Sequence, residues 1–134
     1  MPWEAFPDIE ALVGYWLRTQ IGGSRVYSSI PNNPTWPLVT VKRIGGIPRI
    51  ETMLDSAHIQ LDVWGNNKSE ARDLADNMRR TLHAMQGQKF ATASGAPDNG
   101  YVTAVTDSLG LTFLPDPTTG RDRYIVGVYV YAHR

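Results

Sequence analysis

The segment from Ala57 to Trp64 constrains the fold more than any other part of the sequence, because its side chains alternate in polarity. A period of two predicts a β-strand with one face on a core and the other toward water or a partner protein. The apolar phase comprises Ala57, Ile59, Leu61 and Val63, and the polar phase comprises His58, Gln60 and Asp62.

Two helices are predicted, one before this strand and one after it. Asp8 can cap a helix from about Asp8 to Gln20, and Gly22-Gly23 is expected to end it. Asn67 and Glu70 have the spacing of a capping box, so a second helix starts there and ends before Gly87. Its buried side is expected to carry Ala71, Leu74, Ala75, Met78, Leu82 and Met85.

Further strands are predicted from β-branched and aromatic runs between turn signals. They span residues 25–30, 38–44, 101–106, 110–114 and 123–133. Residues 47–55 form an extended arm or a loop, and residues 91–100 form a loop. We therefore expect one domain over residues 1–134 with an α+β fold, in which two helices pack on one face of a mixed, mostly antiparallel sheet.

The final strand is expected at the centre of the sheet or at a subunit contact, because both of its faces are apolar. Tyr124, Val126, Val128 and Val130 fall on one face, and Ile125, Tyr129 and Tyr131 on the other. Gly127 lies within this strand and indicates a bulge or a close approach by a neighbouring segment.

Composition narrows the function. The 134 residues contain 13 basic and 13 acidic side chains and no cysteine. A net charge of zero gives no electrostatic attraction for nucleic acid or an anionic membrane, and the lack of cysteine excludes disulfides and thiolate chemistry. No apolar run reaches the ~20 residues that span a bilayer, and the first residues lack a signal-peptide pattern. We expect a protein made in the cytoplasm, without a membrane, a metal or a cofactor.

The sequence contains one weak candidate for catalysis. His58, Gln60 and Asp62 share a strand face, with Asp55 just upstream, and could meet a metal or a substrate. The sequence has no HExxH, GxSxG or phosphate-binding loop. A solvated strand face explains these residues more simply, so we predict that the chain is not an enzyme; a small dimeric α+β enzyme or ligand-binding protein is the alternative.

Several aromatic and aliphatic side chains are candidates for a subunit or partner interface, where tryptophan and tyrosine are enriched. Trp64 falls on the polar phase of its strand, and the arm carries apolar side chains. The alternative for the aromatic residues is a second small core within the subunit. The predicted interface residues are Ile50, Met53, Leu54, Trp64, Tyr129 and Tyr131.

Five pieces of the chain, taken in order and spacing, resemble the tail terminator (tail completion) proteins of long-tailed bacteriophages, particularly those that infect actinobacteria. They are residues 6–17 (FPDIEALVGYWL), 37–46 (PLVTVKRIGG), 55–65 (DSAHIQLDVWG), 69–75 (SEARDLA) and 114–126 (LPDPTTGRDRYIV). The strand IQLDVWG followed by EARDLA is the most specific of them.

The resemblance implies a structural virion protein that forms a hexameric ring on the head-proximal end of the tail tube. Such a ring stops tube polymerisation and joins the tail to the head or neck. The implied partners are other copies of the chain, the tail tube protein and the head or neck completion proteins, and DNA only passes through the channel. No catalytic residues are carried over. A head–tail adaptor or neck ring is the alternative within this class.

Overall fold

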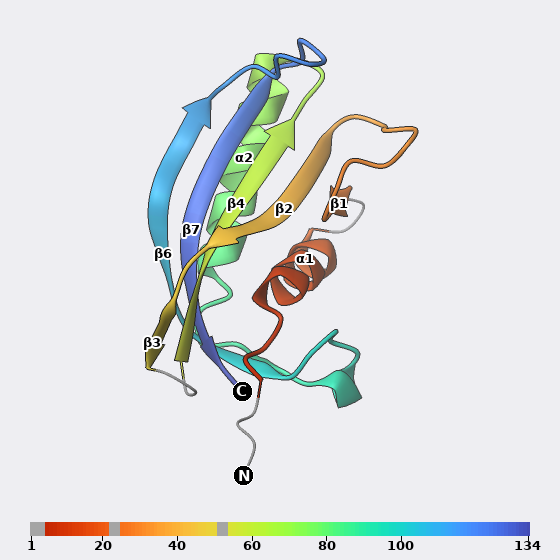
Figure 1. Ribbon diagram of the computed structural model, residues 1–134. Coiled ribbons are helices and arrows are strands. Elements are labelled where there is room, and N and C mark those ends of the chain that lie inside the picture. Colours follow the sequence, from red (N-terminus) through yellow and green to blue (C-terminus); the bar gives the residue numbers. More distant parts are fainter. Residues whose placement is uncertain (1–4, 22–24, 51–53) are drawn as a thin grey trace.

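The computed structural model describes residues 5–21, 25–50 and 54–134, which form one curled sheet with two helices packed on one of its faces (Figure 1). The elements, in chain order, are α1 (Ile9–Gln20), β1 (Val26–Tyr27), β2 (Leu38–Gly45), β3 (Pro48–Ile50), β4 (Leu54–Trp64), α2 (Lys68–His83), β5 (Lys89–Phe90), a 3-10 turn (Thr92–Ser94), β6 (Gly100–Phe113) and β7 (Arg123–His133). The predicted α+β class is confirmed.

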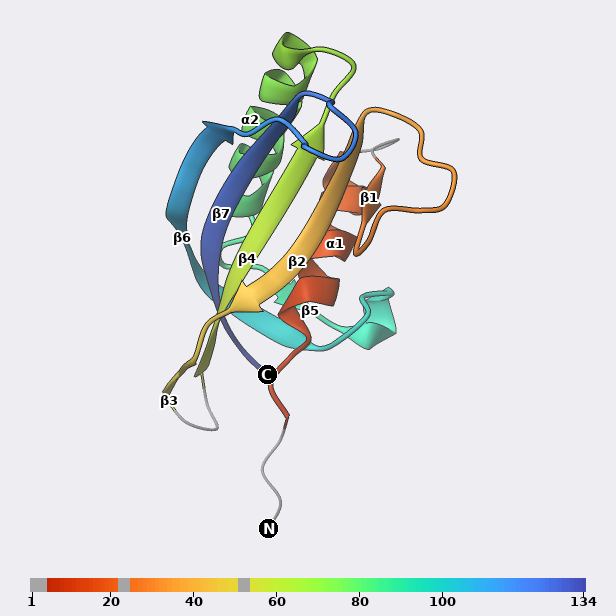
Figure 2. The same cartoon turned by 45° about the horizontal axis from the view of Figure 1, so that its top comes forward.

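The sheet order is β1-β2-β4-β7-β6-β5, and β3 pairs with β4. All pairs are antiparallel except β1 with β2. The strand that is apolar on both faces, β7, lies between β4 and β6, which is one of the two positions predicted for it. Figure 2 shows how strongly these strands twist and curl.

Both helices begin where their capping residues predict. The backbone N–H of Ala11 donates to Asp8 at the start of α1, and that of Glu70 donates to Asn67 at the start of α2. The carboxylate of Glu70 accepts from the N–H of Asn66, not from that of Asn67, as a standard capping box would have it. The predicted stop of α1, Gly22-Gly23, lies outside the described residues.

The core fills the space between the sheet and the helices. It contains the apolar phase of β4, the valines of β7 and the inner faces of α1 and α2. Burying these side chains is the main stabilising term of the fold. The helices also contact each other, since the indole N–H of Trp16 donates to the carbonyl of Thr81 at 2.7 Å.

Three predicted segments differ from the structure. The strand predicted at residues 25–30 is reduced to Val26–Tyr27, because only this dipeptide reaches β2. The strands predicted at 101–106 and 110–114 are one strand, β6, which bulges opposite Gly127. In the arm predicted at 47–55, of which residues 51–53 lie outside the described ranges, β3 pairs as an antiparallel hairpin with the first residues of β4.

The helices of the described ranges lack the length and apolarity that crossing a membrane requires.

Candidate assembly surfaces

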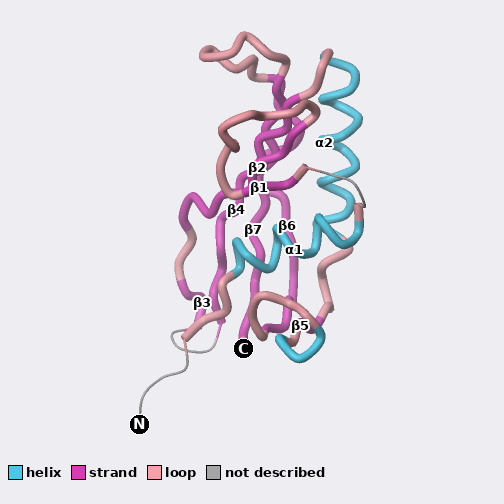
Figure 3. Tube along the Cα trace, turned by 90° about the vertical axis from the view of Figure 1, so that its right-hand side faces the viewer, coloured by secondary structure: helices cyan, strands magenta, loops and turns pink. Residues whose placement is uncertain are grey.

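The side of the sheet that faces away from α1 and α2 is the first candidate surface, and we call it the uncovered face. In Figure 3, α2 lies on one side of the strands, while no helix lies on the other. The register of β4 with β7 places these side chains on it: Ser56, His58, Gln60, Asp62 and Trp64 from β4, and Arg123, Ile125, Tyr129 and Tyr131 from β7.

An aromatic pair occupies the middle of the uncovered face. The rings of His58 and Tyr129 stack with centroids 4.4 Å apart, and both side chains are half-buried. His58 Nε2 lies 2.7 Å from the hydroxyl of Ser108 on β6. Leu109, the residue after Ser108 in β6, is 44% exposed. The face thus offers a fixed aromatic surface next to exposed aliphatic area, which suits a protein contact.

The proposed catalytic group does not converge. Asp55 points to the opposite face of the sheet, where Arg43 binds its carboxylate. Gln60 donates to Asp62 at 2.8 Å, and Asp62 also faces Arg123. In the part of the chain that the structure describes, no three His, Asp or Glu side chains are placed to hold a metal. These contacts engage Gln60, Asp62 and Arg123 with one another and hold the face together.

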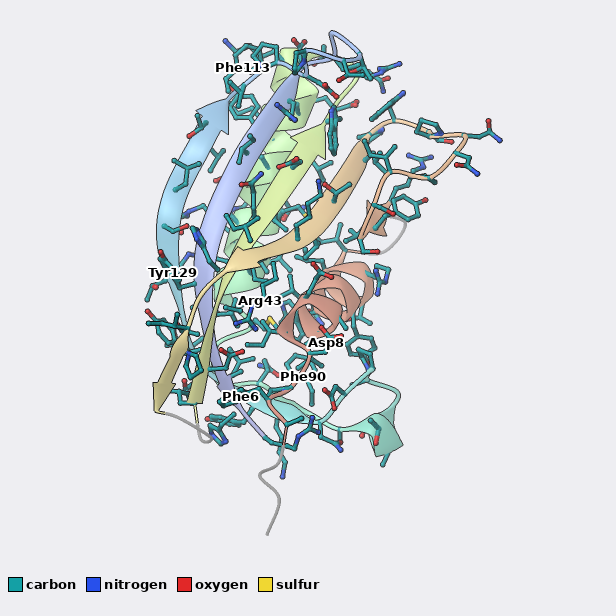
Figure 4. The ribbon with its side chains drawn as sticks, viewed as in Figure 1. Phe6, Asp8, Arg43, Phe90, Phe113 and Tyr129 are labelled. Carbon is teal, nitrogen blue, oxygen red and sulfur yellow. The ribbon has the colours of Figure 1, made fainter. Side chains whose placement is uncertain are left out.

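The hairpin of β3 and β4 is the second candidate surface, and it projects beyond the body of the molecule at the end where the termini lie (Figure 1). Its root is fixed by Arg43, which makes hydrogen bonds of 2.6 and 3.0 Å to Asp55 (Figure 4). Ser56 donates to the carbonyl of Ile47 at 2.7 Å. The side chains of Ile44 and Ile47 are 49% and 69% exposed, so apolar surface is held away from the body.

The hydrogen bonds and charge of Asp55 also act on Arg43. The side-chain hydrogen bond to Asp55 raises the pKa of Arg43 above its ordinary value, despite partial burial. The guanidinium therefore stays charged at any pH at which the protein would assemble.

The third candidate surface lies at the opposite end, where the loops 31–37 and 114–122 meet. We call it the loop end. The ring of Trp36 lies 6.1 Å from that of Trp64, and the guanidinium of Arg121 lies 4.4 Å over Trp36. Trp64 is only 2% exposed, and its indole N–H donates to Asp116. Trp64 therefore supports this end from within the subunit.

Asp116 fixes the conformation of the 114–122 loop. Burial disfavours its charged form, but the hydrogen bonds from the Thr118 N–H, the Trp64 indole and the Thr119 hydroxyl prevail. Together with the charge of Arg123 they lower the pKa of Asp116 below its ordinary value. These hydrogen bonds tie the loop that presents Arg121 to Trp64 of β4.

The structure separates the six predicted interface residues. Tyr129 and Tyr131 share the uncovered face, whereas Trp64 is enclosed beneath the loop end. Leu54 is half-buried in the hairpin, the backbone of Ile50 pairs with it, and Met53 lies outside the described residues. Their role at an interface stays a prediction.

Sequence reasoning missed four exposed or stacked residues of these surfaces: Ile44, Ile47, Trp36 and Arg121. Ile44 lies in the strand predicted at 38–44, and Trp36 lies between that strand and the one predicted at 25–30. The Gly45-Gly46 pair between two isoleucines is a local signal for the turn between β2 and β3, which leads into the hairpin. The stacking of Arg121 on Trp36 has no local signal, since 85 positions separate them in the chain.

The fold has a match among solved structures. A chain in the virion of the native gene transfer agent (GTA) particle superposes with a TM-score of 0.70 at 14% identity, over 94% of this chain and 95% of that chain. At this identity the likeness shows a shared fold, one that a virion particle uses. No curated protein matches the chain.

Residues 10–121 match the family described as tail completion protein gp17. This range takes in most of the chain, so the chain belongs to the tail completion protein gp17 family. The resemblance drawn from the five sequence pieces is confirmed, and the protein has a structural role in a phage tail, in association with other structural proteins of the virion.

Proposed function

We propose that the protein forms a ring, of six copies, that caps the head-proximal end of the tail tube. The ring ends tube polymerisation and provides the surface to which the head or neck binds. Its partners are other copies of the chain, the tail tube protein and the head or neck completion proteins. It works without catalysis, and membership in a family of tail completion proteins supports this.

The uncovered face is the observation that carries the proposal. A half-buried His58–Tyr129 stack, flanked by Tyr131 and the exposed Leu109, is a surface that a neighbouring copy would bury. A closed ring requires each subunit to use two different surfaces. The uncovered face consists of strand side chains, whereas the opposite face is covered by α1 and α2, so the two can serve as such a pair. The zero net charge also suits a channel that must let DNA pass without binding its phosphates.

The test compares the native mass of wild type with that of Y129E/Y131E, by light scattering after size exclusion and by negative-stain imaging. We expect six-fold rings for wild type and monomers for the double variant, because two carboxylates would be buried unpaired in the contact. The control A93E/S94E also adds two negative charges, on the exposed 3-10 turn that follows β5, and should leave the rings intact.

The outcomes separate the candidate functions. Rings that persist in Y129E/Y131E would remove the uncovered face from the interface. Wild type that stays monomeric even with purified tail tubes would refute the ring. Co-sedimentation of the protein with tail-less heads instead of tail tubes would assign it to the head–tail adaptors.

A further inference from the structure

We propose that neighbouring copies meet through an ion pair between Arg121 of one chain and Asp73 of the next, so that the loop end of one copy docks against the start of α2 in its neighbour. This inference rests on the proposed ring and names the surfaces that close it.

The loop end presents a cation that no carboxylate neutralises. In the described ranges, Arg121 has no ion pair, and its guanidinium lies flat over Trp36 at 4.4 Å. Ile30 and Leu114, which flank the two loops in sequence, are 45% and 49% exposed. An arginine held by a tryptophan beside exposed aliphatic side chains has the composition of an interface hot spot.

A groove beside the start of α2 is lined by acidic side chains, and Lys68 and Arg72 of the same turns are not part of its lining. This shallow groove of about 560 Å³ lies beside the first turns of the helix, and its lining contains Glu70 and Asp73 but no basic residue. The half-buried side chain of Leu74 adds apolar area within it. An arginine of another chain, with the aliphatic stem that leads to its guanidinium, fits this lining.

Asp73 is the carboxylate most available for such a contact. Its side chain is 76% exposed, and its ion pair with Arg72 is stretched to 3.9 Å. By contrast, Asp55, Asp98, Asp107 and Asp116 accept hydrogen bonds of 3.0 Å or less from side chains of their own chain. Within one chain, Arg121 and Asp73 form no ion pair with each other.

The placement of the two surfaces suits a second copy of this chain as the occupant. Both lie at the end of the molecule opposite the termini (Figure 1), and in Figure 3 α2 lies on one side of the strands while the loop between β6 and β7 extends on the other. A head-to-tail ring needs two different, complementary surfaces on each subunit, and these two adjoin at Pro37, which lines the groove and ends the loop 31–37. Opposite charges at these positions would fix which surfaces meet and in which register.

The test is a charge swap, read as native mass by light scattering across a dilution series. R121E and D73R should each weaken association at least tenfold, because each places like charges in the contact. R121E/D73R restores an attractive pair and should recover most of the loss. The control K89E reverses an exposed lysine at the other end of the molecule and should assemble as wild type does.

A second measurement uses the absence of cysteine in the chain. R121C/D73C should give disulfide-linked oligomers up to the size of the ring on mild oxidation, and each single cysteine variant should give at most dimers. If R121E and D73R both form rings as wild type does, and R121C/D73C gives no disulfide-linked oligomers, this inference is wrong while the proposed ring is still supported. A wild type that forms no ring with tail tubes would overturn the ring and this contact together.

Discussion

Asp98 ties the beginning and the end of the described chain to the turn before β6. Its carboxylate accepts the backbone N–H of Asp8 at 2.8 Å and the guanidinium of Arg134 at 2.9 Å, and Arg134 also donates to the carbonyl of Ala5. The hydrogen bond from Arg134, followed by that from Asp8, lowers the pKa of Asp98 below its ordinary value. One side chain thus holds three segments together.

This gives a prediction for pH. A carboxylate whose pKa is lower in the folded than in the unfolded chain stabilises the fold fully above the unfolded pKa of about 3.9, and this contribution is lost as the pH falls through the folded pKa. D98N should therefore be less stable than wild type by about 1 kcal/mol at neutral pH, since these are charged but partly exposed hydrogen bonds. This difference in unfolding free energy between wild type and D98N should disappear as the pH falls below 4.

Urea denaturation at a series of pH values measures that difference. D76N is the matched control, because Asp76 makes only an exposed i,i+4 ion pair with Arg80, and its difference in unfolding free energy should stay within about 0.5 kcal/mol at every pH. If the difference in unfolding free energy between wild type and D98N does not change with pH, the substitution destabilises the fold by altering the hydrogen-bond geometry and not by removing the charge.

At the scale of the element, the hairpin of β3 and β4 depends on its turn from β2. Gly46 has a φ of +100°, and a Cβ there would lie 1.9 Å from the carbonyl oxygen of Ser56. Neighbouring Gly45 has nothing within 4 Å of its would-be Cβ. A side chain at Gly46 must therefore displace β4 from the turn, while one at Gly45 displaces nothing.

We predict that G46A destabilises the protein by about 1–3 kcal/mol, the usual cost of a strained backbone position, and loosens the hairpin. G45A, one residue away, should change stability by less than about 0.5 kcal/mol. Chemical denaturation gives the free energies, and amide exchange of Ser56, whose N–H donates to Ile47, reports on the hairpin itself. Equal effects of the two substitutions would contradict the steric argument.

At the scale of the whole molecule, two helices cover one face of a seven-stranded sheet and leave the other bare. The uncovered face, the hairpin and the loop end all lie outside the core between sheet and helices. Residues that stabilise the subunit and residues available for assembly are thus largely different sets. Assembly should be separable from folding by mutation.

Since association stabilises the folded state by mass action, the Tm of wild type should rise with protein concentration. Y129E/Y131E should show a Tm that is independent of concentration and close to that of dilute wild type. Scanning calorimetry over a hundredfold range of concentration would measure both. A wild-type Tm that does not change with concentration would place the assembly step on the tail tube and not in free solution.

The sequence by itself determined the elements whose signals are local. Asp8 and Asn67 mark the starts of the helices, and the alternation from Ala57 to Val63 separates the core side of β4 from its uncovered side. These features depend on neighbours within four residues in the chain, which a pattern can show. The α+β class follows from them, and the two apolar faces of residues 123–133 limit that strand to the centre of the sheet or a subunit contact.

Only the tertiary structure decided the features that depend on distant partners. Residues 101–106 and 110–114 become one strand because β7 continues to pair across the bulges between them. Trp64 falls on the polar phase of its strand, yet it is buried because Trp36 and Asp116 close over it. Arg121 and Trp36 stack across 85 positions of sequence, and no local pattern encodes such a contact, because the fold alone sets the distance between them.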